Sequence, residues 1–280
     1  MTTTLLCLAV FIVIGIMLNL AEHGRRKRKQ QRQEHGLAVL RAGLDLMAAV
    51  QQHRGMSIAF LNGDASFRPK LMGKRQEIQN ILNRIPPVLE STPELHPDRR
   101  SFAVIVDQWN EMLATSEGQV PETSFKQHTS LVRGIIHLMG DMGEHLGLLD
   151  GEGSTLARLS NALLLKLPLL LESIGQARAL GSGYAAQGQC GAVGRIRLSF
   201  LEQRIRECFE GVHNASIENE AVSKKVDEFL LTLESRFIKT DAVDIAPAVF
   251  FQTATDAIDS CLALWRDVAQ DTSTAVMSRG

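Results

Sequence analysis

Apolar side chains recur every three or four positions along most of this chain, which is the spacing that places them on one face of an α-helix. Aromatic residues are few, leucine and alanine are abundant, and no run alternates apolar with polar side chains as a half-buried strand does. Turn-forming residues divide the periodic stretches into about eight helices. The pattern therefore predicts an all-α fold.

The predicted helices fall into two sets of four, separated by a glycine-rich turn at residues 150–154. Turns within each set are short, which keeps neighbouring helices antiparallel. We expect two side-by-side up-and-down four-helix bundles, the first over residues 36–150 and the second over residues 151–271. Residues 272–280 show no apolar period and are expected to form a disordered tail.

The N-terminal stretch predicts a transmembrane helix. Residues 5–20 are apolar except for Gly15 and Asn19, and at about 1.5 Å per residue they just reach across the core of a bilayer. A signal peptide would carry positive charge before its apolar stretch, whereas here a basic juxtamembrane linker follows at residues 25–35. Residues 1–24 are therefore expected to anchor the chain in a membrane.

The basic linker also predicts the orientation of the anchor. Positively charged flanks stay on the cytoplasmic side of a membrane, so the bulk of the chain is expected in the cytoplasm. In a bacterial cell this means a single pass through the inner (cytoplasmic) membrane. Attraction to anionic lipid is a second role for these charges.

Two predicted helices carry an arginine inside an apolar seam. One seam, over residues 37–61, contains Arg54, and the other, over residues 164–185, contains Arg178. A guanidinium keeps its charge, so its burial is costly unless an anion or a set of acceptors meets it. Neither seam contains an acidic residue, which favours an anion from outside the chain. The alternative is a carboxylate from a neighbouring helix, or an arginine head that reaches the surface.

Composition argues against several other functions. The formal net charge of −1 and the absence of a basic face interleaved with aromatic residues argue against nucleic-acid binding. The cysteines follow neither metal-type nor disulfide-type spacing. They are Cys7, Cys190, Cys208 and Cys261.

Metal chemistry has only weak signals in this sequence. Glu210 and His213 form one Glu-x-x-His pair, whereas a dinuclear site in a helical bundle needs two such pairs. His137, Asp141 and His145 share one helical face but have no evident partner ligands. We therefore expect no metal, no cofactor and no enzymatic activity.

The segments around the two arginines carry a resemblance to a known family. They read VQQHRGMS over Val50–Ser57 and IGQARALGSGY over Ile174–Tyr184. These segments resemble the nitrate- and nitrite-sensing (NIT) domain of bacterial signalling proteins. The resemblance covers most of residues 36–270.

The resemblance implies two four-helix bundles and a nitrate or nitrite ion held between helices by one arginine from each half. Carried onto this chain, those arginines are Arg54 and Arg178. Where the family would place an acidic residue ahead of each arginine, this chain has His53 and Ala177. The identity of the anion therefore stays open.

Small and polar residues near the arginines could complete the site, although ordinary hydrogen bonding between helices explains the polar ones equally well. His53 could add pH sensitivity or could simply lie at the surface. The candidates for the shell around the anion are Gln51, Gly55, Ser57, Gly181 and Ser182.

The sequence predicts a membrane-tethered sensor that binds nitrate or nitrite between its bundles. The chain has no kinase histidine box, nucleotide-binding glycine loop or cyclase motif, so the signal would pass to a separate, unidentified protein. A homodimer is a further expectation. The alternative function is a helical scaffold with no small-molecule ligand.

Overall fold

The protein is all-α, as predicted, in a computed structural model that describes residues 2–277 except 117, 152, 216 and 218. The side chains of residues 2–13, 26, 29, 30, 34 and 35 also lie outside the description. Within the described residues there is no strand, and one isolated bridge joins Gln189 to Ala242.

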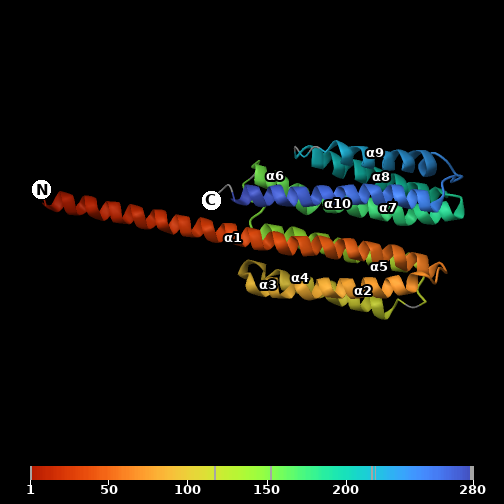
Figure 1. Cartoon of the computed structure of the whole chain (residues 1–280), viewed down its shortest axis with the longest axis horizontal. Helices are drawn as coiled ribbons and strands as arrows, with labels where there is room; N and C mark the ends of the chain where they lie inside the picture. Colours follow the sequence, from red (N-terminus) through yellow and green to blue (C-terminus); the bar gives the residue numbers. More distant parts are fainter. Residues whose placement is uncertain (1, 117, 152, 216, 218, 278–280) are drawn as a thin grey trace.

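The first helix group comprises the first five α-helices and occupies the lower half of Figure 1. In this group α1 packs against α2 and α5, and α4 packs against α5. The elements are α1 (Thr2–Leu61), α2 (Phe67–Arg84), α3 (Pro86–Ser91), the 3₁₀ turn η1 (Pro93–Leu95), α4 (Asp98–Ala114) and α5 (Pro121–His145).

The second helix group comprises the remaining helices and occupies the upper half of Figure 1. Here α7 packs against α8 and α10, and α9 packs against α10. The elements are α6 (Thr155–Asn161), the π-helix η2 (Ala162–Lys166), α7 (Leu167–Gln187), α8 (Ala192–His213), α9 (Glu220–Leu233), the π-helix η3 (Glu234–Ile238) and α10 (Pro247–Met277).

A nine-residue connection, Leu146–Ser154, joins the two groups. Gly147 and Gly151 adopt φ values of 66° and 83°, a left-handed conformation that side chains with a Cβ rarely adopt. At the far end of the connection the Ser154 hydroxyl accepts a hydrogen bond from the Ala157 backbone N–H at 3.1 Å. This N-cap fixes the start of α6.

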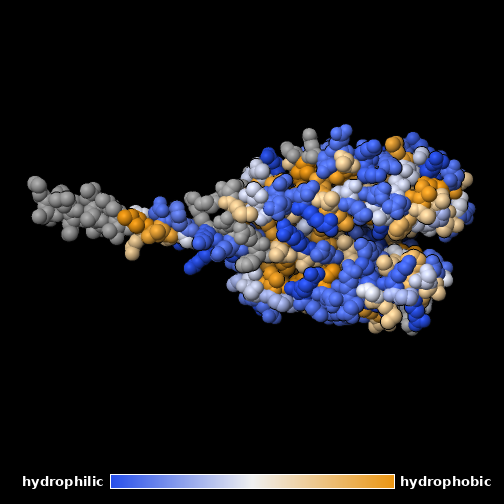
Figure 2. Space-filling model, viewed as in Figure 1, coloured by the Kyte–Doolittle hydropathy of each residue, from blue (hydrophilic) through white to orange (hydrophobic). Residues whose placement is uncertain are grey.

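Helix α1 runs without a break from the N-terminal stretch into the first helix group, so the basic linker is helical (Figure 1). Its projecting part carries apolar side chains, and residues 14, 16, 17, 18 and 20 are each at least 48% exposed (Figure 2). The predicted membrane span begins at residue 5, and its side chains up to residue 13 lie outside the description. Among the described residues, no helix combines the length and apolarity required to cross a membrane.

The predicted disordered tail is wrong for residues 272–277, because α10 continues to Met277. Thr272 is fully buried and Val276 is 1% exposed. The hydroxyl of Thr272 donates to the Val268 carbonyl at 2.7 Å, which allows this polar side chain to sit on a buried face. Residues 278–280 lie outside the description.

Both helix groups share one apolar core, and the second group fills its part with aromatic rings. The Phe250 ring of α10 contacts Phe237, with centroids 4.6 Å apart, and Phe229, with centroids 5.8 Å apart. A Cβ at Gly181 of α7 would lie 2.4 Å from the Phe250 ring. Gly181 therefore lets α7 approach α10 closely.

We predict opposite effects for two alanine substitutions on α7. Gly181→Ala should lower the free energy of unfolding by about 1–3 kcal/mol, because the new methyl group meets a rigid, fully buried ring. Gly183→Ala has no atom within 4 Å of the new Cβ and should be neutral, or stabilising by up to about 1 kcal/mol. Urea unfolding of both variants measures the difference. Equal effects would contradict the close packing at Gly181.

Candidate functional site

Arg54 of α1 lies buried where the first helix group meets the second, and it is 1% exposed. Its Nη1 donates to Oε1 of Glu172 at 2.7 Å, and its Nη2 donates to Oε2 at 3.2 Å. Glu172 belongs to α7 and is itself 5% exposed. This forked ion pair therefore links the two helix groups through their buried faces.

The Glu172 carboxylate has further donors around it. Gln51 of α1 donates to Oε2 at 2.8 Å, and Gln176, one turn along α7, donates to Oε1 at 2.8 Å. Arg54 has a second acceptor, because its Nη1 also donates to the Thr129 hydroxyl of α5 at 3.0 Å. Hydrogen bonds to both partners offset much of the cost of removing two charges from water.

Glu172 is a carboxylate from a neighbouring helix, which is the alternative that the sequence left open for Arg54, and it lies on neither apolar seam. The seam of α7 was traced through its apolar positions, and Glu172 lies on the adjoining stripe with Gly175 and Gln176. A Cβ at Gly175 would lie 3.1 Å from Nη2 of Arg54, so glycine gives the guanidinium room. A stripe of polar and small residues on an otherwise apolar helix was the signal available in the sequence.

Arg178 of α7 is 9% exposed, and its surroundings differ from those of Arg54. Its Nη1 donates to the Thr255 hydroxyl of α10 at 3.0 Å, and its guanidinium lies 4.8 Å from the centroid of the Phe251 ring. Burial, and then the positive charge of Arg54, lower the pKa of Arg178 to about 10, while Asp259 raises it. No carboxylate in the described part of the chain lies within ion-pair distance of Arg178.

The two arginines have matching environments in the two helix groups. Arg54 also bonds a threonine on the last helix of its group, Thr129, and lies 5.4 Å from the ring of Phe125, four residues earlier. Arg178 pairs in the same way with the threonine and phenylalanine of α10. This repeat was not found in the sequence analysis, because each pair is distant in sequence from its arginine.

The match fails at the counter-ion. The offset that relates Arg54 to Arg178 places Ala48 at the position that corresponds to Glu172. The first helix group thus has an alanine at the position where the second group has a carboxylate. Arg54 is neutralised within the protein, whereas Arg178 keeps an unpaired positive charge inside a largely apolar surrounding.

In the described part of the chain, two buried polar groups near the arginines have no hydrogen-bond partner. They are Nε of Arg54 and the hydroxyl of Ser182, which lies one turn beyond Arg178 on α7. A buried donor left without an acceptor costs about 1–3 kcal/mol. Together with the free guanidinium nitrogens of Arg178, these groups give the region spare donors and an excess of positive charge.

The other predicted residues have varied surroundings. Gln51 lies in the Arg54 site as a donor to Glu172, and a Cβ at Gly55 would meet no atom within 4 Å. The space beside Gly181 is filled by the Phe250 ring, so this glycine makes no room for a ligand. The hydroxyl of Ser57, one turn beyond Arg54 on α1, lies 3.3 Å from Nδ1 of His53.

His53 is also not a surface residue, because it is 1% exposed. Among the histidines considered as metal ligands, Nδ1 of His145 lies 2.9 Å from the Asp98 carboxylate. In the described part of the chain, no group of three or more His, Cys, Asp or Glu side chains is close enough together to hold a metal ion.

Comparisons with known proteins identify the fold and the family. The solved structure of the NasR transcription antiterminator resembles this chain with a TM-score of 0.73 and 15% sequence identity, covering 94% of this chain and 74% of the NasR chain. At this identity the likeness concerns the fold. A comparison with curated protein sequences gave no match.

The family model described as nitrate and nitrite sensing matches residues 45–273, a region that contains both arginines and both helix groups apart from residues 2–44 of α1 and the last residues of α10. The resemblance predicted from the two arginine segments is confirmed. The chain belongs to the nitrate and nitrite sensing (NIT) family.

Proposed function

We propose that this protein senses nitrate or nitrite by binding the anion beside Arg178, where the two helix groups meet. The observation that carries the proposal is the buried guanidinium of Arg178, which has no carboxylate partner among the described residues although Arg54 has one. Membership of the nitrate and nitrite sensing family supports the choice of ligand.

The chemistry of the site suits a small planar anion. Nitrate and nitrite offer acceptors in one plane, and a guanidinium presents its donors in one plane, so the two fit edge to edge. Arg178 uses one Nη1 bond on Thr255, which leaves donors for an anion. Ser182, one turn away, has an unused hydroxyl in the same neighbourhood.

Arg54 and Glu172 have a different role in this proposal. Their ion pair stays closed and holds the two helix groups together, while the positive charge of Arg54 adds to the field at Arg178. The negative charge of the Glu172 carboxylate repels an anion bound nearby, so it lowers the affinity of the Arg178 site for nitrate or nitrite. An anion that neutralises Arg178 would favour the arrangement of the two groups in which it is held, which is the basis of a sensor.

In this proposal, helix α1 transmits the effect of anion binding away from the site. It carries Arg54 near one end and continues without a break to residue 2, about 80 Å away at 1.5 Å per residue. A displacement at Arg54 would therefore be passed along a continuous helix. We propose that a separate protein reads this displacement, and that each helix group acts as a four-helix bundle domain, residues 36–150 and 151–277.

We also propose that residues 5–20 tether the protein to the inner membrane, with the helix groups in the cytoplasm. The support is the apolar sequence, the exposed apolar side chains of residues 14–20 on the projecting part of α1, and the basic residues that follow. The alternative function, a scaffold without a small-molecule ligand, differs in that it should not respond to nitrate.

The first prediction concerns anion binding. Nitrate or nitrite should raise the thermal midpoint of the full chain more than chloride or sulfate does at matched ionic strength. At a ligand concentration of 100 times the Kd, binding adds about 2.7 kcal/mol to the free energy of unfolding. Arg178→Ala should abolish the response. Arg206→Ala, which removes an exposed arginine paired with Glu202, should keep it. If none of the anions changes the thermal midpoint of the wild type, the proposed function is overturned and the scaffold is favoured.

The second prediction concerns Glu172. Without nitrate, Glu172→Gln should be less stable than the wild type by about 3–5 kcal/mol, because Arg54 loses its buried counter-ion. Nitrate should then stabilise this variant more than it stabilises the wild type, since the competing carboxylate is gone. Thermal melts with and without nitrate measure both effects. The control is Glu202→Gln, which changes a partly buried glutamate that pairs with Arg206 on the same helix, and an equal gain in all three proteins would refute the role given to Glu172.

The third prediction concerns the tether. The full chain should sediment with membranes and stay there after alkaline carbonate and high salt, whereas a chain that lacks residues 1–24 should be released. Replacing the basic residues between 25 and 32 by glutamine tests attachment through charge alone. Release of the full chain by carbonate would be incompatible with a spanning helix.

A further inference from the structure

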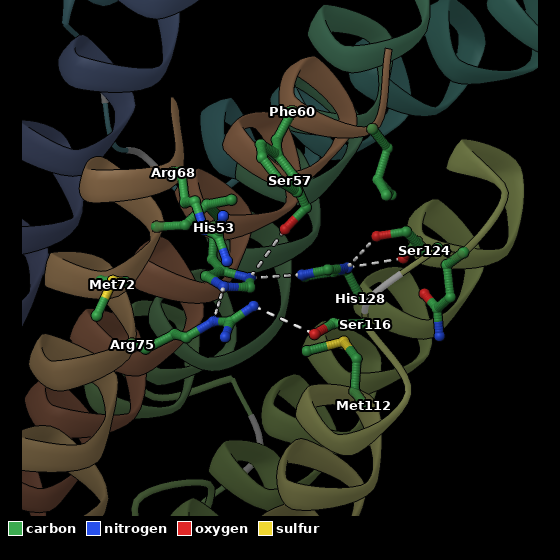
Figure 3. Close-up of a pocket in the computed structure, with 14 residues that line it drawn as sticks. His53, Ser57, Phe60, Arg68, Met72, Arg75, Met112, Ser116, Ser124 and His128 are labelled. Carbon is green, nitrogen blue, oxygen red and sulfur yellow. Dashed lines mark hydrogen bonds between the residues drawn. The ribbon is translucent and has the colours of Figure 1, made fainter. Parts of the chain in front are cut away.

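A cavity of about 420 Å³ lies in the first helix group, and neither Arg54 nor Arg178 is among the residues that line it. It opens where α1 ends and α5 begins, and α2 and α4 complete its walls (Figure 3). Its volume falls in the range of small-molecule sites, roughly 300–1,000 Å³, and greatly exceeds the space that an ion of a few atoms requires. The cavity is therefore too large to be explained by nitrate or nitrite alone.

One wall of the cavity is basic. Arg68 and Arg75 both line it, and they lie two turns apart on the same face of α2. Nη2 of Arg75 donates to the Ser116 hydroxyl at 3.2 Å, and no described carboxylate lies within ion-pair distance of either arginine. None of the residues that line the cavity is aspartate or glutamate. The cavity therefore carries an excess of positive charge.

A chain of hydrogen bonds between buried histidines holds Arg75 in place (Figure 3). Nδ1 of His128 lies 2.7 Å from the Ser124 carbonyl oxygen, which can only accept, so His128 carries its proton on Nδ1. Its Nε2 then accepts from Nδ1–H of His53 at 2.8 Å. Nε2 of His53 is left as the acceptor for Nε–H of Arg75 at 3.4 Å.

This hydrogen-bond chain decides what the histidines can do. Burial, the mutual proximity of the rings and the nearby cations lower the pKa of His53 to about 2, and burial chiefly lowers the pKa of His128 to about 4. Both rings are neutral at physiological pH, and all four ring nitrogens are engaged. They position Arg75, and they have no free nitrogen for a metal ion or a substrate proton.

Apolar side chains also line the cavity. They are Phe60 and Leu61 at the end of α1, Met72 of α2, which lies between the two arginines, and Met112 of α4 (Figure 3). Methionine side chains adapt to ligands of different shape, and Met72 is 67% exposed at the opening. A ligand that fits this surrounding combines a negative charge with an apolar body.

We propose that this cavity binds a small organic acid, with its carboxylate on Arg68 and Arg75 and its apolar body against the side chains of Phe60 and Met112. Arginine forks match carboxylate geometry through paired hydrogen bonds, and both arginines have donors that no described protein group uses. This site is independent of the anion site at Arg178. A second ligand in the first helix group would give the protein a second input.

Binding of defined probes to the full chain in detergent tests the proposal. Hexanoate, benzoate and phenylacetate are titrated by calorimetry, beside hexanamide and benzamide as uncharged counterparts and acetate as a carboxylate with almost no apolar body. We expect at least one of the three larger carboxylates to bind, and to bind about tenfold or more tightly than its amide and than acetate. No binding of these three acids up to about 10 mM would overturn the proposal.

Matched variants locate the binding. Arg68→Met with Arg75→Met should weaken the carboxylate about tenfold or more, whereas Lys70→Met removes a charge from the same helix outside the cavity lining and should change nothing. Met72→Trp partly fills the opening from an exposed position and should also weaken binding, which gives a second test if the double variant does not fold. Equal binding to the wild type and these cavity variants would overturn the assignment. Arg178→Ala should leave the carboxylate affinity unchanged, so this result and the nitrate result can fail separately.

Discussion

The buried ion pair between Arg54 and Glu172 is the interaction on which the arrangement of this protein depends. Each partner comes from a different helix group, and each is almost fully removed from water. Neither can be separated from the other without leaving an uncompensated charge inside the protein, so the two groups are held in one register at this point. Gln51, Gln176 and Gly175 adapt the surrounding helices to the pair rather than to a ligand.

The same interaction explains why Arg178 is available. Both arginines sit on the first long helix of their group, and each uses a threonine and a phenylalanine one turn apart on the last helix. Only one of the two arginines has a carboxylate partner, because Ala48 occupies the position in the first group that corresponds to Glu172 in the second. A protein selected only for stability would gain from a carboxylate partner for each arginine, whereas an anion sensor needs one arginine without such a partner.

The spacing of apolar residues predicted the helices and both arginine seams, because the period of an amphipathic helix is visible in consecutive residues. A carboxylate partner for Arg54 was one alternative, but the sequence could not identify Glu172, because this residue reaches Arg54 only through the packing of α7 on α1. His53 was read as a surface residue for the same reason, since its burial depends on His128 of α5. The end of α10 was missed because Thr272 looks polar in sequence and is satisfied by its own helix. The pattern within one helix can be predicted from the sequence, whereas contacts between side chains of different helices require the structure.

The π-helix η2, between α6 and α7, bears on how this protein can change during evolution. A π-turn holds one residue more than an α-helical path needs, and such turns persist mainly where they serve a site. Deleting one residue from Ala162–Lys166 would convert this turn into a regular α-helical turn, while the helices on either side keep the faces that they already present. The surplus residue is thus confined to one turn, and a relative that lacks it could keep the alignment of Glu172 with Arg54.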